Sequence, residues 1–244
     1  PAITAYGASE TKYSDYIENS AYKESLEDII LCGGDYDASQ SSALVSKGSY
    51  LGEDNVLIWD SNDDQVSYKF DVKTEGLYNI RITYASVAEN GNDFEFGLKI
   101  DGEYPFETSK TLMLPQMWQN ADTKKTDASG NEYAPEQAVY NSYISKELFD
   151  PSGSIMGELE FAFSSGRHTV TLEKETGSVI ISEIALSAAL TSEKYDDIIK
   201  QYKDSKYSEY SGDPIIIEGE DATLKSTRSL VAKSDNSSAD ILPK

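Results

Sequence analysis

The sequence predicts an all-β fold, an antiparallel β-sandwich of jelly-roll type with short flanking helices. Tyr and Gly are abundant, with 17 and 16 copies among 244 residues, as is typical of short strands joined by tight turns. Many segments alternate apolar and polar side chains with a period of two, the pattern of a strand that buries one face. About eight or nine such strands favour two sheets packed face to face.

The expected strands lie between residues 26 and 188. Residues 65–72 and 77–84 alternate on either side of a polar turn, so we expect a hairpin there. Residues 164–167 form another tight connection between strands, and residues 150–153 have the composition of a turn. The other expected strands are the Ile-rich run 29–31 and residues 56–59, 94–100, 157–163, 168–173 and 179–186.

Two short amphipathic helices are expected, in residues 9–22 and 192–204. Their apolar side chains recur at the spacing of one helix face, and Ser192 is placed to cap the second helix. Such stripes are more often packing surface than binding sites. The stripes consist of Tyr13, Tyr16 and Ile17 in the first helix and Tyr195, Ile198, Ile199 and Tyr202 in the second.

The chain begins to repeat itself near its end. Residues 29–36 align with residues 215–222, and the same offset aligns residues 44–47 with residues 230–233. The two helices echo each other at a slightly shorter offset, as a difference in linker length explains. The chain therefore reads as one module and the opening of another. In order, we expect a helical leader (1–25), a β-sandwich module (26–188), a helical linker (189–213) and the truncated start of a second, similar module (214–244).

Composition excludes several classes of function. The formal net charge is −22, with 43 acidic residues against 21 Lys and Arg, so nucleic acid and anionic membrane surfaces are not expected partners. No apolar run is long enough for a transmembrane helix, so no direct membrane insertion is expected. The lone Cys32 permits neither an intrachain disulfide nor a zinc cluster, and we expect it to be a small buried hydrophobe.

The chain starts at Pro1 without the basic and apolar regions of a signal peptide. We expect an extracellular or cell-surface protein, secreted by a signal sequence that is absent here; an intracellular location is the alternative. Residues 102–150 interrupt the strand pattern with several prolines, Trp118 and a long polar run. An insertion of this kind is either functional or disordered, and its aromatic content favours function.

Several of these elements resemble a known family. Residues 65–72, 76–85, 165–172 and 180–186 are similar to the galactose-binding-like β-sandwiches of carbohydrate-binding module families 6 and 35. The likeness covers residues 26–188. It implies a jelly roll that binds glycan without catalysing a reaction.

The insertion carries a second resemblance. Residues 114–118 and 127–135 look like the accessory domain that precedes the sugar-binding domains of some large Gram-positive solute-binding lipoproteins. Gln116 departs from that pattern, because those domains tend to have Arg there, and this puts an inherited ligand contact in doubt.

The second copy resembles the opening of the same modules. Residues 218–222 are similar to a Glu-Ala-Glu-Asp opening whose carboxylates bind a structural calcium ion. The resemblance implies that Glu218 and Glu220 hold calcium in the truncated second copy. At the aligned positions the first module has Cys32 and Gly34, which offer no hard oxygen ligand, so no cofactor is expected there.

A carbohydrate site needs a flat aromatic ring to stack on a sugar and planar polar side chains to pair with its hydroxyls. Residues of both types gather in the expected loops. Trp118 also follows Leu114 and Met117, so it is equally suited to pin the insertion to the sandwich, and Trp59 follows an apolar run and is expected in the core. The candidate carbohydrate-binding residues are Trp118, Tyr104, Tyr133, Asn92, Asp127 and Asn131.

Catalysis finds little support in the sequence. The single histidine, His168, begins a strand after a turn, where a structural role outweighs that of a general base. Nucleophile-elbow and phosphate-loop motifs are absent. The sequence does not exclude the paired carboxylates of a glycosidase, because it does not give the distance between two carboxylates. Asp60–Asp64 starts like a calcium loop but lacks its glycine and glutamate, so a hairpin turn is the preferred interpretation.

The leading hypothesis is therefore a non-catalytic extracellular domain like a carbohydrate-binding module. It would bind an oligo- or polysaccharide, or assist sugar capture by a larger surface protein, as one of at least two tandem copies. The alternative is a structural or protein-interaction β-sandwich spacer of a surface solute-binding lipoprotein, packed against neighbouring domains of the same protein and without its own sugar site.

Overall fold

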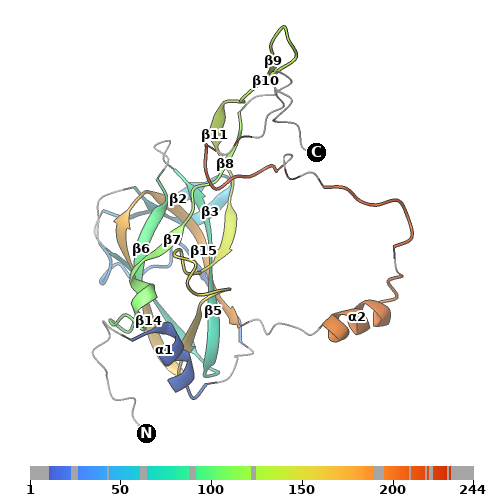
Figure 1. Ribbon diagram of the computed structural model, residues 1–244. Coiled ribbons are helices and arrows are strands. Elements are labelled where there is room, and N and C mark those ends of the chain that lie inside the picture. Colours follow the sequence, from blue (N-terminus) through green and yellow to red (C-terminus); the bar gives the residue numbers. More distant parts are fainter. Residues whose placement is uncertain are drawn as a thin grey trace.

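The computed structural model is an all-β antiparallel sandwich with two short helices, α1 (Tyr13–Asn19) and α2 (Tyr195–Asp204), as the sequence predicts (Figure 1). None of the helices in the described residues is long and apolar enough to cross a membrane. The structure describes residues 11–22, 27–42, 44–60, 65–87, 92–121, 125–189, 195–208, 210–217, 219, 222–229 and 231.

Two antiparallel sheets form the sandwich. The seven-stranded sheet is built around β5 (Gly76–Ser86) and β15 (Val179–Ala188), which pair with each other. Its other strands are β1 (Ile29–Cys32), β2 (Ser46–Tyr50), β3 (Glu53–Trp59), β12 (Ile144–Glu147) and β13 (Glu160–Phe163). The four-stranded sheet has the order β4 (Gln65–Val72), β14 (Gly166–Thr176), β6 (Phe94–Ile100) and β7 (Leu112–Leu114).

The core lies between the two sheets, and both supply its large side chains. Trp59 and Tyr78 come from the seven-stranded sheet, and Tyr68 and Phe96 come from the four-stranded sheet; each is 1% exposed or less. The ring of Trp59 packs against that of Phe94 with their centroids 5.3 Å apart, which confirms its predicted core position. Each aromatic side chain removes on the order of 150–250 Å² from water, so these residues dominate the packing energy.

The predicted hairpin of residues 65–72 and 77–84 is wrong. β4 pairs with β14, whereas β5 pairs with β15, so the connection between them crosses from one sheet to the other. Glu27 organises this crossing, because its Oε2 accepts hydrogen bonds from the amides of Lys73 and Thr74 at 2.9 and 2.8 Å. A polar link between two alternating strands looks the same in sequence whether the strands pair or face each other.

Two other connections also cross between the sheets. β13 belongs to the seven-stranded sheet and β14 to the four-stranded sheet, so the tight connection at residues 164–165 joins opposite layers. β3 and β4 likewise lie in different sheets, so the predicted hairpin turn at Asp60–Asp64 is wrong. Residues 61–64 of that connection lie outside the described residues.

Helix α1 closes the outer edge of β13. The hydroxyl oxygen of Tyr13 accepts a hydrogen bond from the amide of Glu160 at 2.9 Å, and that of Tyr16 accepts one from the amide of Ala162 at 2.7 Å. Both rings also pack on Phe106, with centroids 5.0 and 5.1 Å away. The helix therefore satisfies backbone donors that an edge strand would leave open, and its stripe is packing surface as predicted.

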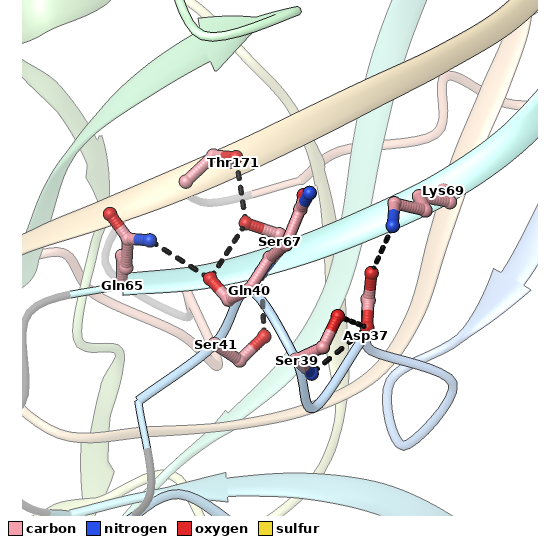
Figure 2. Close-up of polar contacts among 8 residues, drawn as sticks. All are labelled: Asp37, Ser39, Gln40, Ser41, Gln65, Ser67, Lys69 and Thr171. Carbon is pink, nitrogen blue, oxygen red and sulfur yellow. Dashed lines mark hydrogen bonds and ion pairs between the residues drawn. The ribbon is translucent and has the colours of Figure 1, made fainter.

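A second segment covers the opposite sheet in a similar way. Residues 37–42 follow the outer edge of β4, where the amide of Asp37 donates to the carbonyl of Ser67 at 2.7 Å and the amide of Ser42 donates to the carbonyl of Gln65 at 2.9 Å. β4 is the terminal strand of its sheet, so the segment covers an exposed edge. The polar contacts drawn in Figure 2 join Asp37, Ser39, Gln40, Ser41, Gln65, Ser67, Lys69 and Thr171.

The insertion is ordered in its described residues. It begins with the 3-10 helix η1 (Glu107–Lys110). β8 (Trp118–Asn120) then pairs with β11 (Gln137–Val139), and β9 (Lys125–Thr126) pairs with β10 (Glu132–Tyr133). These four strands form a ribbon that projects beyond the sandwich (Figure 1).

The segments that align in sequence, α1 with α2 and β1 with residues 215–217, differ in their surroundings. Helix α2 lies apart from the sandwich, and its Tyr195 and Tyr202 are 75% and 53% exposed (Figure 1). Residues 215–217, which align with β1, are also exposed and are not assigned to a strand. Tyr195 and Tyr202 of α2 are thus exposed, whereas Tyr13 and Tyr16 of α1 pack on Phe106.

The prediction that Cys32 is buried is wrong, because its side chain is exposed. Ile29 and Leu31 of β1 pack against the core, whereas Ile30 is 63% exposed and Cys32 lies on the same outer face. Successive side chains of a strand point to opposite faces of the sheet. The position of a residue in the strand, rather than the apolar character of the run, therefore decides whether its side chain is buried.

Candidate functional site

A cavity of about 980 Å³ opens beside α1. η1, the paired strands β6 and β7, and the loop 150–155 form its other walls. Its charged lining is mostly acidic, and Lys12 is the one cation among the described residues that line it. Three of the acidic residues are exposed and the fourth, Asp150, is buried. The acidic residues are Glu95, Glu107, Asp150 and Glu175.

Asp150 builds the loop that forms one wall. Its Oδ1 accepts a hydrogen bond from the amide of Ser152 at 2.9 Å, and its Oδ2 accepts from the Ser152 hydroxyl at 2.8 Å and from the amide of Ile155 at 2.9 Å. Burial raises the pKa of Asp150, but these hydrogen bonds outweigh burial and hold the pKa below its usual range. The predicted turn is confirmed, and Asp150 is a fixed anion that supports the wall.

The remaining lining combines hydroxyls with apolar surface. Thr108 and Ser154 contribute hydroxyl groups, while Tyr13, Met113 and Ile155 contribute apolar atoms. Carboxylates and hydroxyls accept hydrogen bonds from hydroxylated ligands, and adjacent apolar surface suits the C–H face of a sugar ring. The volume also falls within the range of about 300–1,000 Å³ that is common for ligand sites.

Three of the predicted carbohydrate-binding residues come together at the tip of the ribbon. Asp127 accepts hydrogen bonds at its Oδ1 from the amides of Ser129 and Asn131 at 2.8 and 2.9 Å, and its Oδ2 accepts from the Asn131 side chain at 3.1 Å. The hydrogen bond from the backbone of Asn131 is the largest influence that lowers the pKa of Asp127. Tyr133 follows on β10 and is 60% exposed, so it offers a ring to solvent.

The other three predicted residues lie in different places. Trp118 begins β8 and is only 6% exposed, with the guanidinium of Arg228 6.0 Å from its ring centroid. Asn92 is exposed just before β6. Tyr104 donates a short hydrogen bond to Glu173. The six residues therefore do not form one site.

The calcium site implied by the resemblance involves Glu218 and Glu220, and the positions aligned with them are Cys32 and Gly34. Glu218 and Glu220 lie outside the described residues. In the first module, a Cβ atom added at Gly34 would lie 2.3 Å from Oδ1 of Asn55, and Cys32 faces outward. The added Cβ atom would also lie 2.7 Å from the backbone carbonyl oxygen of Asn55, so a side chain at position 34 requires the backbone to shift.

His168 lies near a carboxylate and a hydroxyl group, but the geometry of its contacts fits a structural role and not a catalytic one. Its Nδ1 lies 2.7 Å from Oδ2 of Asp101, and its Nε2 lies 2.9 Å from the carbonyl oxygen of Ser164 and 3.3 Å from the Ser164 hydroxyl. A carbonyl oxygen only accepts, so the closer contact requires a proton on Nε2. A nitrogen that carries this proton cannot take one from Ser164, and the histidine instead joins two turns at the sandwich end.

No family model matches this sequence, and no curated protein matches it. Solved structures do match. A family 35 carbohydrate-binding module from Clostridium thermocellum is similar at 6% identity and a TM-score of 0.40, over 67% of this chain and 99% of that one. A family 35 module from Cellvibrio japonicus is similar at 13% identity and a TM-score of 0.36, over 67% of this chain and 95% of the module.

A larger enzyme also matches over part of its length. It is the Podospora anserina β-(1,4)-mannanase that combines GH26 and CBM35 domains, at 13% identity and a TM-score of 0.39, over 69% of this chain. The match spans only 29% of that enzyme. The chain thus resembles family 35 modules, as its sequence pattern predicts, and the resemblance concerns the fold.

Proposed function

We propose that this chain is a non-catalytic, extracellular domain that binds glycan, or assists sugar capture by a larger surface protein. The observation that carries the proposal is the cavity beside α1, in which exposed carboxylates and hydroxyls surround apolar surface. This combination suits a polyhydroxylated ligand.

The charge of the cavity narrows the ligand class. Four acidic residues line it against one lysine, and Glu95, Glu107 and Glu175 are exposed at its surface. An acidic site repels acidic ligands and accepts hydrogen bonds from hydroxyl or ammonium groups. We therefore expect neutral or amino sugars to bind in preference to uronic acids.

A glycan-array screen of the 244-residue chain, with calcium and with chelator, is the first test. Any hit is followed by calorimetry of Glu107→Gln and Glu175→Gln, which keep shape but remove charge. Glu75→Gln is the matched control, because this exposed residue lies in the connection between β4 and β5. A loss of affinity of about tenfold is expected in the cavity variants, the size of a lost charge-assisted hydrogen bond, with no change in the control.

A second variant separates the cavity from the ribbon. Tyr133→Ala removes the exposed ring beside Asp127 and Asn131 while leaving the cavity intact. Loss of binding in Tyr133→Ala alone would move the sugar site to the ribbon tip. The absence of binding to neutral, amino and acidic glycans, both with calcium and with chelator, would overturn the proposal. Glycan binding that is stronger with calcium than with chelator would support the structural calcium proposed for Glu218 and Glu220.

The second candidate function is a spacer or protein-interaction module of a surface solute-binding lipoprotein. The observation that favours it is the covered ring of Trp118, which lies against Arg228 of the second copy rather than in an open site. Under this alternative no glycan binds, while variants in the ribbon change the binding of the chain to its neighbouring domains.

A further inference from the structure

The segment 222–229 contacts the ribbon along the edge of β8 that β11 does not use. The amide of Trp118 donates to the carbonyl of Lys225 at 2.8 Å, and the amide of Lys225 donates to the carbonyl of Trp118 at 2.9 Å. The two bonds make an antiparallel bridge, so the segment adds a third strand position beside β8 and β11 (Figure 1).

Side chains reinforce this bridge. The ammonium group of Lys225 donates to Oδ1 of Asn120 at 2.5 Å and to Oε1 of Gln137 at 3.2 Å, so one cation ties together β8 and β11. Gln137 also donates from its Nε2 to the same oxygen of Asn120 at 2.8 Å. Arg228 lies over the Trp118 ring at 6.0 Å, within reach of a cation–π contact.

The aligned segment also lies along a strand edge, with its backbone bonds at Asp37 and Ser42. In the repeat, residues 223–228 fall on residues 37–42. Residues 37–42 cover the outer edge of β4 through backbone hydrogen bonds to Gln65 and Ser67. Figure 2 shows the contacts between this segment and β4 that involve side chains. Both copies of this segment therefore lie along the edge of a strand, one within its own module and the other on the ribbon of the preceding module.

We infer that the ribbon is a docking site for the opening segment of the following module, which binds by strand addition to β8. Strand addition gives affinity through the backbone, and side chains at alternate positions give specificity. The preferred partner is an extended segment with lysine at the bridging position and arginine three residues later, as in Lys225 and Arg228. Trp118 is then an interface residue between consecutive modules.

Amide hydrogen exchange in the 244-residue chain tests this inference directly. Lys225→Pro removes the donor to Trp118, and Arg228→Ala removes the cation over its ring. We expect the amide of Trp118 to exchange about tenfold faster in each variant, as for the loss of one hydrogen-bonded contact, while the amide of Leu172 in the core is unchanged. Lys203→Ala on α2 is the control and leaves both amides at the wild-type rate.

Tryptophan fluorescence gives an independent readout. Trp59 is fully buried, so a change in acrylamide quenching reports on Trp118. Quenching should increase in Lys225→Pro and Arg228→Ala and stay constant in Lys203→Ala. Unchanged exchange and quenching at Trp118 in both ribbon variants would overturn the inference, as would a uniform acceleration of Trp118 and Leu172, which reports unfolding of the sandwich. Neither readout depends on glycan binding.

Discussion

The hydroxyl oxygen of Tyr16 on α1 accepts a 2.7 Å hydrogen bond from the backbone amide of Ala162, at the outer edge of β13. We expect Tyr16→Phe to lower the free energy of unfolding by about 1–3 kcal/mol, because the partly buried amide loses its acceptor. Urea titration at neutral pH measures this. Tyr195→Phe is the matched control on α2, where the side chain is 75% exposed, and it should have no effect. Equal stability of Tyr16→Phe and wild type would mean that α1 does not close the edge in solution.

Buried tyrosines predict a loss of stability at alkaline pH. Burial raises the pKa of Tyr16 to about 12, and it raises the pKa values of Tyr68 and Tyr84 above their usual range. The hydroxyls of Tyr68 and Tyr84 donate to the carbonyls of Gly33 and Pro115, both at 2.7 Å, and an ionised oxygen could not donate. Below the ordinary tyrosine pKa of 10.0 all three are neutral in both states, so their contribution to stability is complete.

As pH rises from 10 towards 12, the unfolded chain loses these protons before the folded chain does. The free energy of unfolding should therefore fall steeply across this window. Urea titrations at steps of pH, with Tyr absorbance recorded for the folded protein, would show the trend. A flat stability profile through this range would contradict the assigned burial.

Removal of the Asp150 charge should weaken the wall of the cavity. In Asp150→Asn a single carbonyl oxygen replaces two carboxylate oxygens that accept from Ser152 and Ile155, so we expect a loss of about 1–3 kcal/mol in unfolding free energy at neutral pH. Chemical denaturation measures the loss. Asp71→Asn is the control, since its ion pair with Arg167 is exposed and contributes little.

The same variant carries a pH signature. The folded pKa of Asp150 lies below the ordinary value of 3.8, so its contribution is present above that pH and is lost as pH falls through the folded pKa. The stability difference between wild type and Asp150→Asn should therefore shrink below about pH 4. A difference in unfolding free energy that stays constant below about pH 4 would show that the charge of Asp150 does not stabilise the fold.

A methyl group at Gly33 should disrupt the close packing of the end of β1 against β15 and β3. Its Cβ would lie 1.8 Å from the carbonyl oxygen of Ile181 and 3.0 Å from the amide nitrogen of Leu57, and both are backbone atoms that cannot turn aside. We expect Gly33→Ala to cost about 3 kcal/mol or more, at the upper end for overpacking. In Gly219→Ala the added atom meets nothing within 4 Å, so its melting temperature should match that of wild type. Similar thermal melts for the two variants would contradict the close approach.

The alternation of side chains was sufficient to predict the fold class and the main strands, because each strand buries one face. β4 begins and ends where the sequence predicts, at Gln65 and Val72. The partners of the strands could not be predicted in this way. β4 and β5 are neighbours in sequence but lie in opposite sheets, since pairing depends on contacts with β14 and β15 far along the chain.

The candidate site was less accessible to sequence reasoning. Glu95 and Glu175 carry no distinguishing signal in a chain with 43 acidic residues, and only the fold places them beside α1. Trp118 contacts Lys225 and Arg228, which belong to another part of the chain. A local window around the tryptophan contains no trace of them.

The helix that closes β13 also sets the smallest fragment that keeps the sandwich complete. A fragment beginning at Ile29 would contain every described strand of the sandwich, yet the amides of Glu160 and Ala162 would lack their tyrosine acceptors. A complete fragment therefore starts before Tyr13, so α1 belongs to the folded unit although it lies outside both sheets.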